Sequence, residues 1–107
     1  MCWLRYSSAS SPLRVSDCGS GNFCAWVDTS YGGTPYQVFG SDNNWPGWID
    51  NDEESVYNHG TTGMVVTVFD YNYKLGDLYC VLSGQAFSSL SHPNDGNSHG
   101  WYYYCTS

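Results

Sequence analysis

One short segment holds the densest group of oxygen ligands that this chain could offer to a metal ion. Asp50, Asp52, Glu53 and Glu54 fall within five residues, and no Lys or Arg follows closely to neutralise them. Carboxylate and carbonyl oxygens are the ligands that Ca²⁺ prefers. A run of like charges is, however, equally typical of a solvated loop. From the residues alone, both interpretations of this acidic segment remain open.

Other patterns that could carry chemistry are weaker. His92 and His99, with Asp95 between them, have a spacing that a transition metal could use, although exposed His residues in Asn- and Gly-rich loops are far commoner. The acidic run has no apolar neighbour that would raise the pKa of one carboxyl group, so an acid/base pair is not indicated. The sequence also lacks a nucleophile elbow and a phosphate-binding Gly loop. We therefore predict that the protein is not an enzyme.

Composition limits the class of partner. The chain has 107 residues, only 3 Lys plus Arg and a formal net charge of −7, so it has no basic stripe for a phosphate backbone and nucleic acid is an unsuitable partner. No stretch approaches the roughly 20 apolar residues that span a bilayer. We expect a monomer that binds another protein rather than nucleic acid or a membrane.

The elements that position these residues follow from an internal repeat. Several residues recur at an offset of 43 positions without a gap, which indicates one unit of about 40 residues used twice. Each half is too small to bury a core alone, so the halves should pack together. We predict a flexible N-terminal lead over 1–17 and one domain over 18–107, with units of about 18–60 and 61–107. The recurring pairs are Trp26 and Phe69, Gly33 and Gly76, Asn51-Asp52 and Asn94-Asp95, and Ser55 and Ser98.

The units are predicted to consist of strands. Aromatic residues make up 18% of the chain and Gly occupies 12 positions, a balance that suits short strands joined by Gly, Asn and Asp turns. Alternating or β-branched runs predict strands at 23–27, 36–39, 55–57, 64–70, 79–82 and 101–104. Four strands per unit would give about eight, arranged as two Greek key units in an all-β sandwich.

The five cysteines favour disulfides, because none forms the CxxC pair of a zinc or redox site. Disulfides imply an oxidising compartment, so we expect a secreted protein. Composition does not choose among the three connectivities of four cysteines. The short turn between Cys18 and Cys24 favours joining these two, which leaves Cys80 for Cys105. Cys2, in the Ser-rich lead, is expected to stay unpaired.

The segment Trp45-Pro46-Gly47-Trp48 is the candidate contact surface for a partner protein. Two Trp residues on a loop constrained by Pro and Gly would offer a large rigid area, as interface hot spots do. The alternative is that Trp45 and Trp48 fold back and cap the sandwich. The sequence leaves both possibilities open.

Two stretches resemble the Greek key signature of the βγ-crystallins. Residues 26–33 (WVDTSYGG) have its aromatic-x4-aromatic-x-Gly form, in which Gly permits a positive φ and the aromatic residues pack on a folded hairpin. Residues 69–76 keep the first aromatic residue and the Gly, but Lys74 stands where the inner aromatic residue belongs. We expect Tyr73 to fill that position.

The wider stretch from 18 to 105 resembles the small secreted proteins grouped with actinobacterial metalloproteinase inhibitors. The resemblance runs from residues 18–26 (CGSGNFCAW) through 55–60 (SVYNHG) to Asn94-Asp95 and Ser98. It implies a small β-sandwich that inhibits an extracellular protease. Because such domains also occur as calcium-binding structural or stress modules and as killer-toxin-like antimicrobial proteins, these functions are the alternatives.

The resemblance to βγ-crystallins also implies two calcium sites. One would use Asn51-Asp52, the Glu53 carbonyl and the Ser55 hydroxyl, completed by Asp70. The second is weaker, because the position equivalent to Asp70 is Val27 and its neighbour Asp28 points to the other face of a strand. The alternative is that both Asn-Asp pairs are plain turns. The ligands expected at the second site are Asn94, Asp95, the Gly96 carbonyl, the Ser98 hydroxyl and Asp28.

Overall fold

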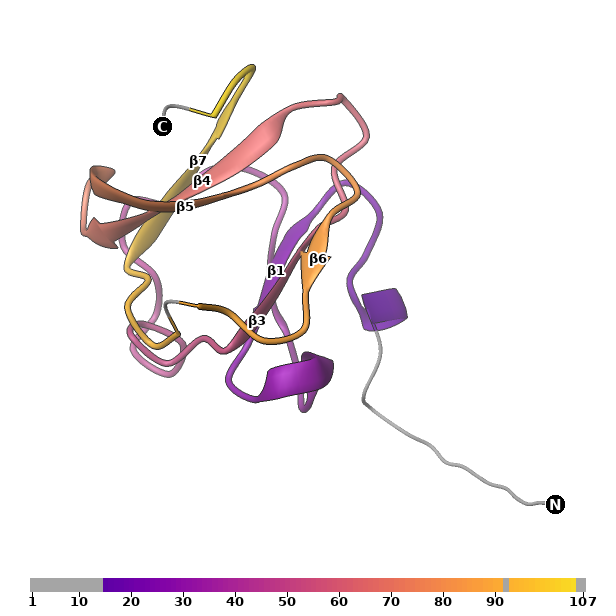
Figure 1. The fold of residues 1–107 in the computed structure, drawn as a ribbon, viewed down its shortest axis with the longest axis vertical. Helices are drawn as coiled ribbons and strands as arrows, with labels where there is room; N and C mark the ends of the chain where they lie inside the picture. Colours follow the sequence, from indigo (N-terminus) through magenta and orange to yellow (C-terminus); the bar gives the residue numbers. More distant parts are fainter. Residues whose placement is uncertain (1–14, 92, 106–107) are drawn as a thin grey trace, which may run out of the picture.

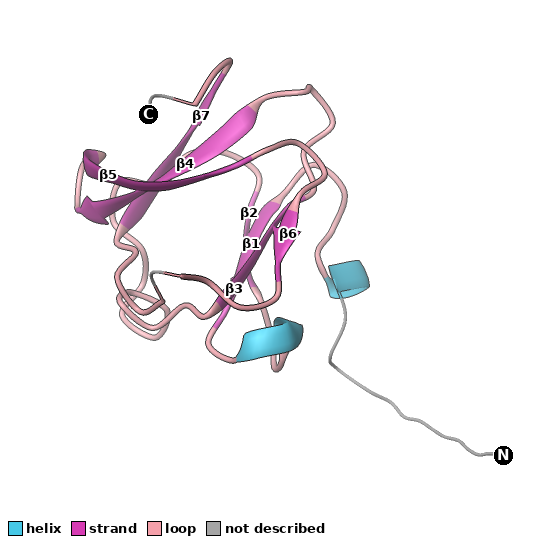
Figure 2. Ribbon diagram, in the orientation of Figure 1, coloured by secondary structure: helices cyan, strands magenta, loops and turns pink. Residues whose placement is uncertain are grey.

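The protein is built from two antiparallel sheets with very little helix (Figures 1 and 2). The structure, a computed structural model, describes residues 15–91 and 93–105. Two 3₁₀ turns, η1 (Val15–Asp17) and η2 (Thr29–Tyr31), are the helical elements of these residues. One sheet has the order β2-β1-β3-β6 and the other β5-β4-β7. The strands are β1 (Phe23–Trp26), β2 (Tyr36–Val38), β3 (Ser55–Asn58), β4 (Val65–Tyr71), β5 (Leu75–Val81), β6 (Ala86–Phe87) and β7 (Ser98–Tyr102).

Each of the two units contributes a segment to the sheet of the other unit. The first sheet takes β1, β2 and β3 from the first unit and β6 from the second, whereas β4, β5 and β7 form the other sheet. The position equivalent to β6 in the first unit is occupied by a single bridge, in which Asp42 pairs with His99 of β7. Each sheet therefore contains one segment of the opposite unit, which ties the halves together.

The all-β prediction is confirmed, with seven strands in the described residues in place of about eight. In place of the eighth strand, the first unit has only the bridge at Asp42. The Asp42 carboxylate accepts a hydrogen bond from the backbone N–H of Asn44 at 3.0 Å, which turns the chain away from the sheet. The boundaries of β5 and β7 also differ. They begin at Leu75 and Ser98, earlier than the expected 79 and 101.

The repeat predicted at 43 residues appears in the backbone. Gly33 and Gly76 both have positive φ, 86° and 77°. Asn51 and Asn94 also match, at 60° and 67°. A positive φ is uncommon for a residue with a side chain, so its recurrence at equivalent places shows that the two units share one backbone design.

The core lies between the sheets. Large buried side chains from both sheets meet there, and the loop between β2 and β3 adds Trp45 and Ile49. Burial of such side chains contributes roughly 1.5–3 kcal/mol each. The members of this core with zero exposure are Phe23, Ala25, Ile49, Val56, Val66, Val68 and Val81.

Two disulfides join cysteines of the domain, one near the start of the described chain and one that includes its last described residue. Cys18 is bonded to Cys24 and Cys80 to Cys105, each with a Cα–Cα distance of 5.9 Å, so the predicted pairing is confirmed. Cys2 and most of the predicted lead lie outside the described residues. The last three residues of that lead form η1.

Candidate functional site

Each unit contains a folded hairpin, residues 28–33 in the first and 71–76 in the second, which we call the first and second hairpins. A buried Ser ties each hairpin to its sheet. Ser55 Oγ accepts the Tyr31 N–H at 3.1 Å and donates to the Asp28 carbonyl at 2.7 Å. Ser98 Oγ makes the equivalent bonds to the Lys74 N–H, at 3.0 Å, and the Tyr71 carbonyl, at 2.7 Å. The backbones of the two hairpins are therefore held alike.

The second hairpin is also fastened to the other unit. Asn43, from the loop after β2, accepts the Tyr73 N–H through its carbonyl at 2.8 Å. Its side-chain oxygen accepts a hydrogen bond from Lys74 Nζ at 2.6 Å. Because Ser98 and Asn43 approach the hairpin from different elements, its backbone is fixed before any partner arrives.

The side chains of the two hairpins differ. In the first, Tyr31 packs edge-on against the buried Trp26, with ring centroids 5.2 Å apart. In the second, Lys74 occupies the position of Tyr31, and the apolar side chains around it face solvent. The expectation that Tyr73 fills the inner position is wrong. The exposed fractions are 63% for Tyr71, 69% for Tyr73 and 61% for Leu75.

The electrostatic setting of the second hairpin is also distinct. Lys74 is the only Lys or Arg among the described residues, because the other two basic residues are Arg5 and Arg14. The chain carries ten Asp and Glu residues. The second hairpin therefore combines three exposed apolar side chains with the one Lys of the described part of an acidic molecule.

The two Asn-Asp loops, residues 51–55 and 94–98, pair with each other. The Asn51 N–H donates to the Gly96 carbonyl at 2.8 Å, and the Asn94 N–H donates to the Glu53 carbonyl at 2.6 Å. Glu53 and Gly96 occupy equivalent places in the repeat. This reciprocal pairing joins the units at one edge of the molecule.

Glu53 is a fully buried carboxylate, although the sequence predicted a solvated loop or a metal ligand. It accepts hydrogen bonds from the Gly96 N–H, at 3.0 Å, and from Tyr79 OH, at 2.8 Å. Burial raises its pKa to about 7, an effect that these hydrogen bonds only partly offset. The assumption that nothing in this run could raise a carboxyl pKa is therefore wrong, because the burial comes from the opposite unit.

Several oxygens predicted as calcium ligands make hydrogen bonds within the protein. Ser55 and Ser98 use their hydroxyls on their own hairpins, and the Glu53 and Gly96 carbonyls accept hydrogen bonds from the facing loop. No group of three or more His, Cys, Asp or Glu side chains gathers within residues 15–91 and 93–105. These observations do not test the predicted set of carbonyl and hydroxyl ligands, so both the ligand set and calcium binding stay predictions.

Three of the other predicted ligands lie close together, because the Asn97 side-chain amide donates to Asn51 Oδ1 at 3.1 Å and to the carbonyls of Asp70 and Asp95. Asp70 is half-buried and its carbonyl accepts a hydrogen bond from the Asn97 side chain. The remaining predicted ligands are exposed side chains: Asp28, Asn51, Asp52, Asn94 and Asp95.

The two predicted contact residues, Trp45 and Trp48, differ in how far they are exposed to solvent. Trp45 is 2% exposed and donates from its indole N–H to His99 Nδ1 at 2.9 Å, so it cannot meet a partner as predicted. The other ring nitrogen of His99 faces the Gly40 carbonyl at 2.9 Å, and burial lowers the pKa of His99 to about 4. Trp48 is 51% exposed, and its role in contact stays a prediction.

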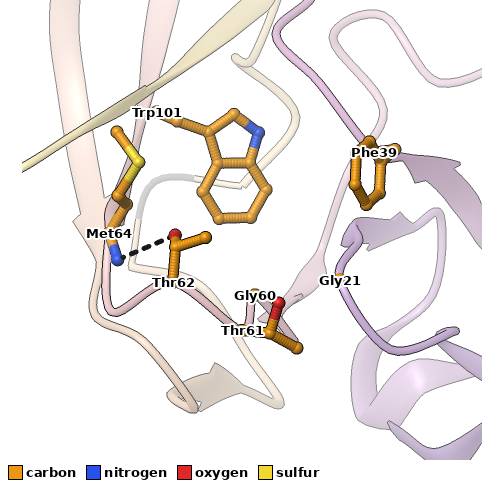
Figure 3. Close-up of a pocket in the computed structure, with 7 residues that line it drawn as sticks. All are labelled: Gly21, Phe39, Gly60, Thr61, Thr62, Met64 and Trp101. Atoms are coloured by element: carbon orange, nitrogen blue, oxygen red, sulfur yellow. Dashed lines mark hydrogen bonds between the residues drawn. The ribbon is translucent and has the colours of Figure 1, made fainter.

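An open apolar pocket of about 260 Å³ is lined by described residues that belong to neither hairpin (Figure 3). Phe39 and Trp101 face each other across it, and Met64 and two threonines line another side. Among the residues that the structure describes, those that line it carry no charged side chain. No helix in the described part of the chain is long and apolar enough to cross a bilayer.

Comparisons with solved structures identify the fold. A structure described as "Evolution of the eye lens beta-gamma-crystallin domain fold" superposes with a TM-score of 0.69 at 11% identity, covering 80% of this chain and 89% of that one. A βγ-crystallin domain from Clostridium beijerinckii gives a TM-score of 0.59 at 14% identity, with coverages of 78% and 99%. A βγ-crystallin from an archaeon gives 0.59 at 11% identity, with the same coverages. The predicted βγ-crystallin-like architecture is confirmed.

The sequence comparison identifies the family. The pattern of peptidase inhibitor family I36 matches residues 12–81, which include the whole second hairpin. No curated protein matches the sequence significantly. A family of inhibitors agrees with the predicted non-enzymatic role, and together with the disulfides it is consistent with an extracellular protein. This chain belongs to peptidase inhibitor family I36.

Proposed function

We propose that the protein is a secreted inhibitor of an extracellular peptidase, and that the second hairpin makes the central contact. Family membership supports inhibition in general. The observation that carries the proposal is the exposure of Tyr71, Tyr73 and Leu75 on one short turn. Exposed single apolar residues are ordinary, but three within five residues on a fixed backbone are typical of a recognition surface.

Tyrosine suits this role. It offers a large amphipathic contact area while losing few rotatable bonds, and Tyr is enriched among interface hot spots. The hydrogen bonds from Ser98 and Asn43 hold the backbone beneath Tyr73. A surface that is already ordered loses less conformational entropy on binding. The second hairpin therefore meets both conditions for tight docking into a concave cleft.

The experiment is an inhibition assay with the purified protein. It is titrated against a thermolysin-type metallopeptidase and other extracellular metallo- and serine peptidases, and Tyr73→Ser is compared on each enzyme that is inhibited. The substitution places at 73 the residue type that the first hairpin carries at Ser30, where φ is 54° against 62° at Tyr73. The fold should tolerate it, while the inhibition constant should rise about 30-fold or more, as for a hot-spot residue.

Tyr104→Ser is the matched control. Tyr104 is 81% exposed but follows β7 at the end that pairs with Val65, whereas the second hairpin follows the opposite end of β4. We expect its inhibition constant to stay within about threefold of the wild type, since surface residues outside a contact matter little. Absence of inhibition across the panel would refute the proposed function. Inhibition that survives Tyr73→Ser would instead move the contact to another surface.

A further inference from the structure

The apolar pocket has two aromatic walls that the fold itself does not bury. Phe39 is 79% exposed, and Trp101 stands opposite it across the opening (Figure 3). A single exposed aromatic residue is ordinary. Two that face each other across one opening, however, can enclose a ring-shaped ligand and remove apolar surface from water on both of its faces.

Hydrogen bonds to the Gly40 carbonyl fix the position of one wall relative to the other. Trp101 donates to this carbonyl from its indole N–H at 3.0 Å, and His99 Nε2 lies 2.9 Å from it. Because Trp45 donates to His99 Nδ1, the proton of the neutral imidazole is on Nε2, which therefore also donates to Gly40. Gly40 directly follows Phe39, so the backbone of one wall is bonded to the side chain of the other.

Each aromatic ring also lies against a glycine that lines the pocket. A Cβ added at Gly60 would stand 2.7 Å from Cζ3 of Trp101, and one added at Gly21 would stand 3.0 Å from Cε1 of Phe39. A side chain at Gly60 would therefore displace the Trp101 ring. Because the rings are positioned before a ligand arrives, less conformational entropy is lost on binding.

The pocket also has a polar side. Thr61 and Thr62 line it, and within residues 15–91 and 93–105 Thr61 makes no hydrogen bond through its backbone or its hydroxyl. A purely apolar ligand would cover these polar groups without satisfying them, which costs free energy. A ligand with hydroxyls around its rim would satisfy them.

The charge and size of the pocket limit the ligand further. None of the described residues that line it is charged, so neither an anion nor a cation would find a counter-charge there. Its volume of about 260 Å³ is just below the roughly 300–1,000 Å³ of sites for drug-sized molecules. The pocket therefore suits a single neutral ring.

We infer that this pocket binds one neutral pyranose ring of a glycan between Phe39 and Trp101. A pyranose has C–H groups on its two faces, which suit the negative faces of aromatic rings, and hydroxyls around its rim, which suit Thr61. Because the pocket is open, further sugars of the chain can continue into solvent. The inference goes beyond peptidase inhibition, since none of the described lining residues belongs to the second hairpin.

The experiment titrates the isotope-labelled full chain with methyl β-glucopyranoside, methyl β-N-acetylglucosaminide and methyl α-mannopyranoside, followed by NMR. We expect at least one glycoside to bind in the millimolar range, with the largest shifts at the Thr61 amide and the Trp101 indole N–H. Tighter binding of the glucoside would point to a glucan as the source of the sugar, and tighter binding of the mannoside to a mannose-rich glycan.

Two substitutions test the aromatic walls. Phe39→Ala should fold, because Phe39 is exposed, and should weaken glycoside binding about tenfold or more through the loss of one stacking face. Gly60→Ala keeps every lining side chain but displaces the Trp101 ring, so it should weaken binding as well. The matched control is Tyr104→Ala. Tyr104 is 81% exposed but does not line the pocket, and its variant should bind within about twofold of the wild type.

Three results would overturn the inference. The first is the absence of shifts at the pocket with all three glycosides, and the second is a Phe39→Ala variant that binds them as the wild type does. The third is tighter binding of N-acetylphenylalanine amide than of any glycoside, which would assign the pocket to a protein side chain. Because binding is read without a peptidase, failure of this site and failure of the proposed inhibition are observed separately.

Discussion

In the first hairpin Tyr31 turns inward onto Trp26, whereas in the second the equivalent residue is Lys74 and its neighbours Tyr71 and Tyr73 turn outward. The serine hydrogen bonds and the positive φ values that shape the two backbones are nevertheless the same. Hydrogen bonds between a serine hydroxyl and the backbone therefore maintain the fold in both hairpins. The outward side chains of the second hairpin are free to serve recognition.

The loops before β3 and β7 also differ, because the first packs a side chain into the core where the second exposes one. The first carries Trp45 into the core, while the equivalent Ser88 of the second is exposed. A Cβ added at Gly96 would lie 2.5 Å from the Glu53 carboxylate and 2.6 Å from the Trp45 ring. Gly96 leaves the space that the first unit fills. The first unit thus supplies much of the packing, and the second displays the apolar surface.

The largest effect on stability is expected at Trp45. Trp45→Ala should lower the free energy of unfolding by about 3–5 kcal/mol, because it empties a core position and removes the hydrogen bond to His99. Ser88→Ala, at the equivalent exposed position, should change it by less than about 0.5 kcal/mol. Urea denaturation of both variants measures the difference. Equal effects would mean that the two loops contribute alike.

The pH dependence of stability should reveal the buried Glu53. Its folded pKa of about 7 lies above the usual 4.5, so its contribution is complete below about 4.5 and is lost as pH rises through 7. His99 acts oppositely, since its folded pKa of about 4 lies below 6.5 and its contribution is lost as pH falls through 4. Between about pH 6.5 and 4.5 the folded state holds one proton at Glu53, and the unfolded state holds one at His99. Because both states then hold the same number of these protons, the two effects on the free energy of unfolding cancel.

Glu53→Gln should remove this compensation. As the pH is lowered from roughly 6.5 to 5, the free energy of unfolding of this variant should fall by about 1.4 kcal/mol for each pH unit relative to that of the wild type measured in parallel. Urea denaturation at pH 6.5 and pH 5 gives the two slopes. Parallel slopes for wild type and variant would show that Glu53 titrates normally and is not held buried by the second loop.

A smaller stability difference is expected between the inner positions of the two hairpins. Tyr31→Ala should cost about 1.5 kcal/mol, because a half-buried aromatic ring leaves Trp26. Lys74→Ala removes a hydrogen bond to Asn43 at the surface and should cost less than about 0.5 kcal/mol. Thermal unfolding of the two variants tests the contrast. A larger loss from Lys74→Ala would show that the second hairpin also serves the core.

Calcium should have the smallest effect. Because the hydroxyls of Ser55 and Ser98 are engaged within the protein, we expect the Tm in millimolar calcium to match the Tm in chelator. Ligand binding to the folded state alone would raise it. A rise of several degrees that Asp70→Ala abolishes would instead support the calcium site predicted at Asn51 to Ser55.

The features that could be predicted from sequence are those with local causes. The hairpin glycines and the Cys18–Cys24 disulfide are each set by residues close together in the chain, and the repeat is visible because those local patterns occur twice. Burial of polar groups was missed because it depends on distant partners. Glu53 is enclosed by Gly96 from the other unit, and Trp45 finds its acceptor at His99, 54 residues away. Lys74 in an aromatic position was the one local sign that the second hairpin differs.

Transfer of the side chains of the first hairpin onto the second tests whether the side chains of the second hairpin make the contact with the peptidase. The substitutions Tyr71→Asp, Asn72→Thr, Tyr73→Ser, Lys74→Tyr and Leu75→Gly give the second hairpin the side chains of the first. Both backbones are already bonded alike, so the variant should fold with a Tm within a few degrees of the wild type. Its inhibition of a peptidase that the wild type inhibits should fall about 100-fold or more. A folded variant that inhibits as strongly as the wild type would show that the second hairpin does not make the central contact.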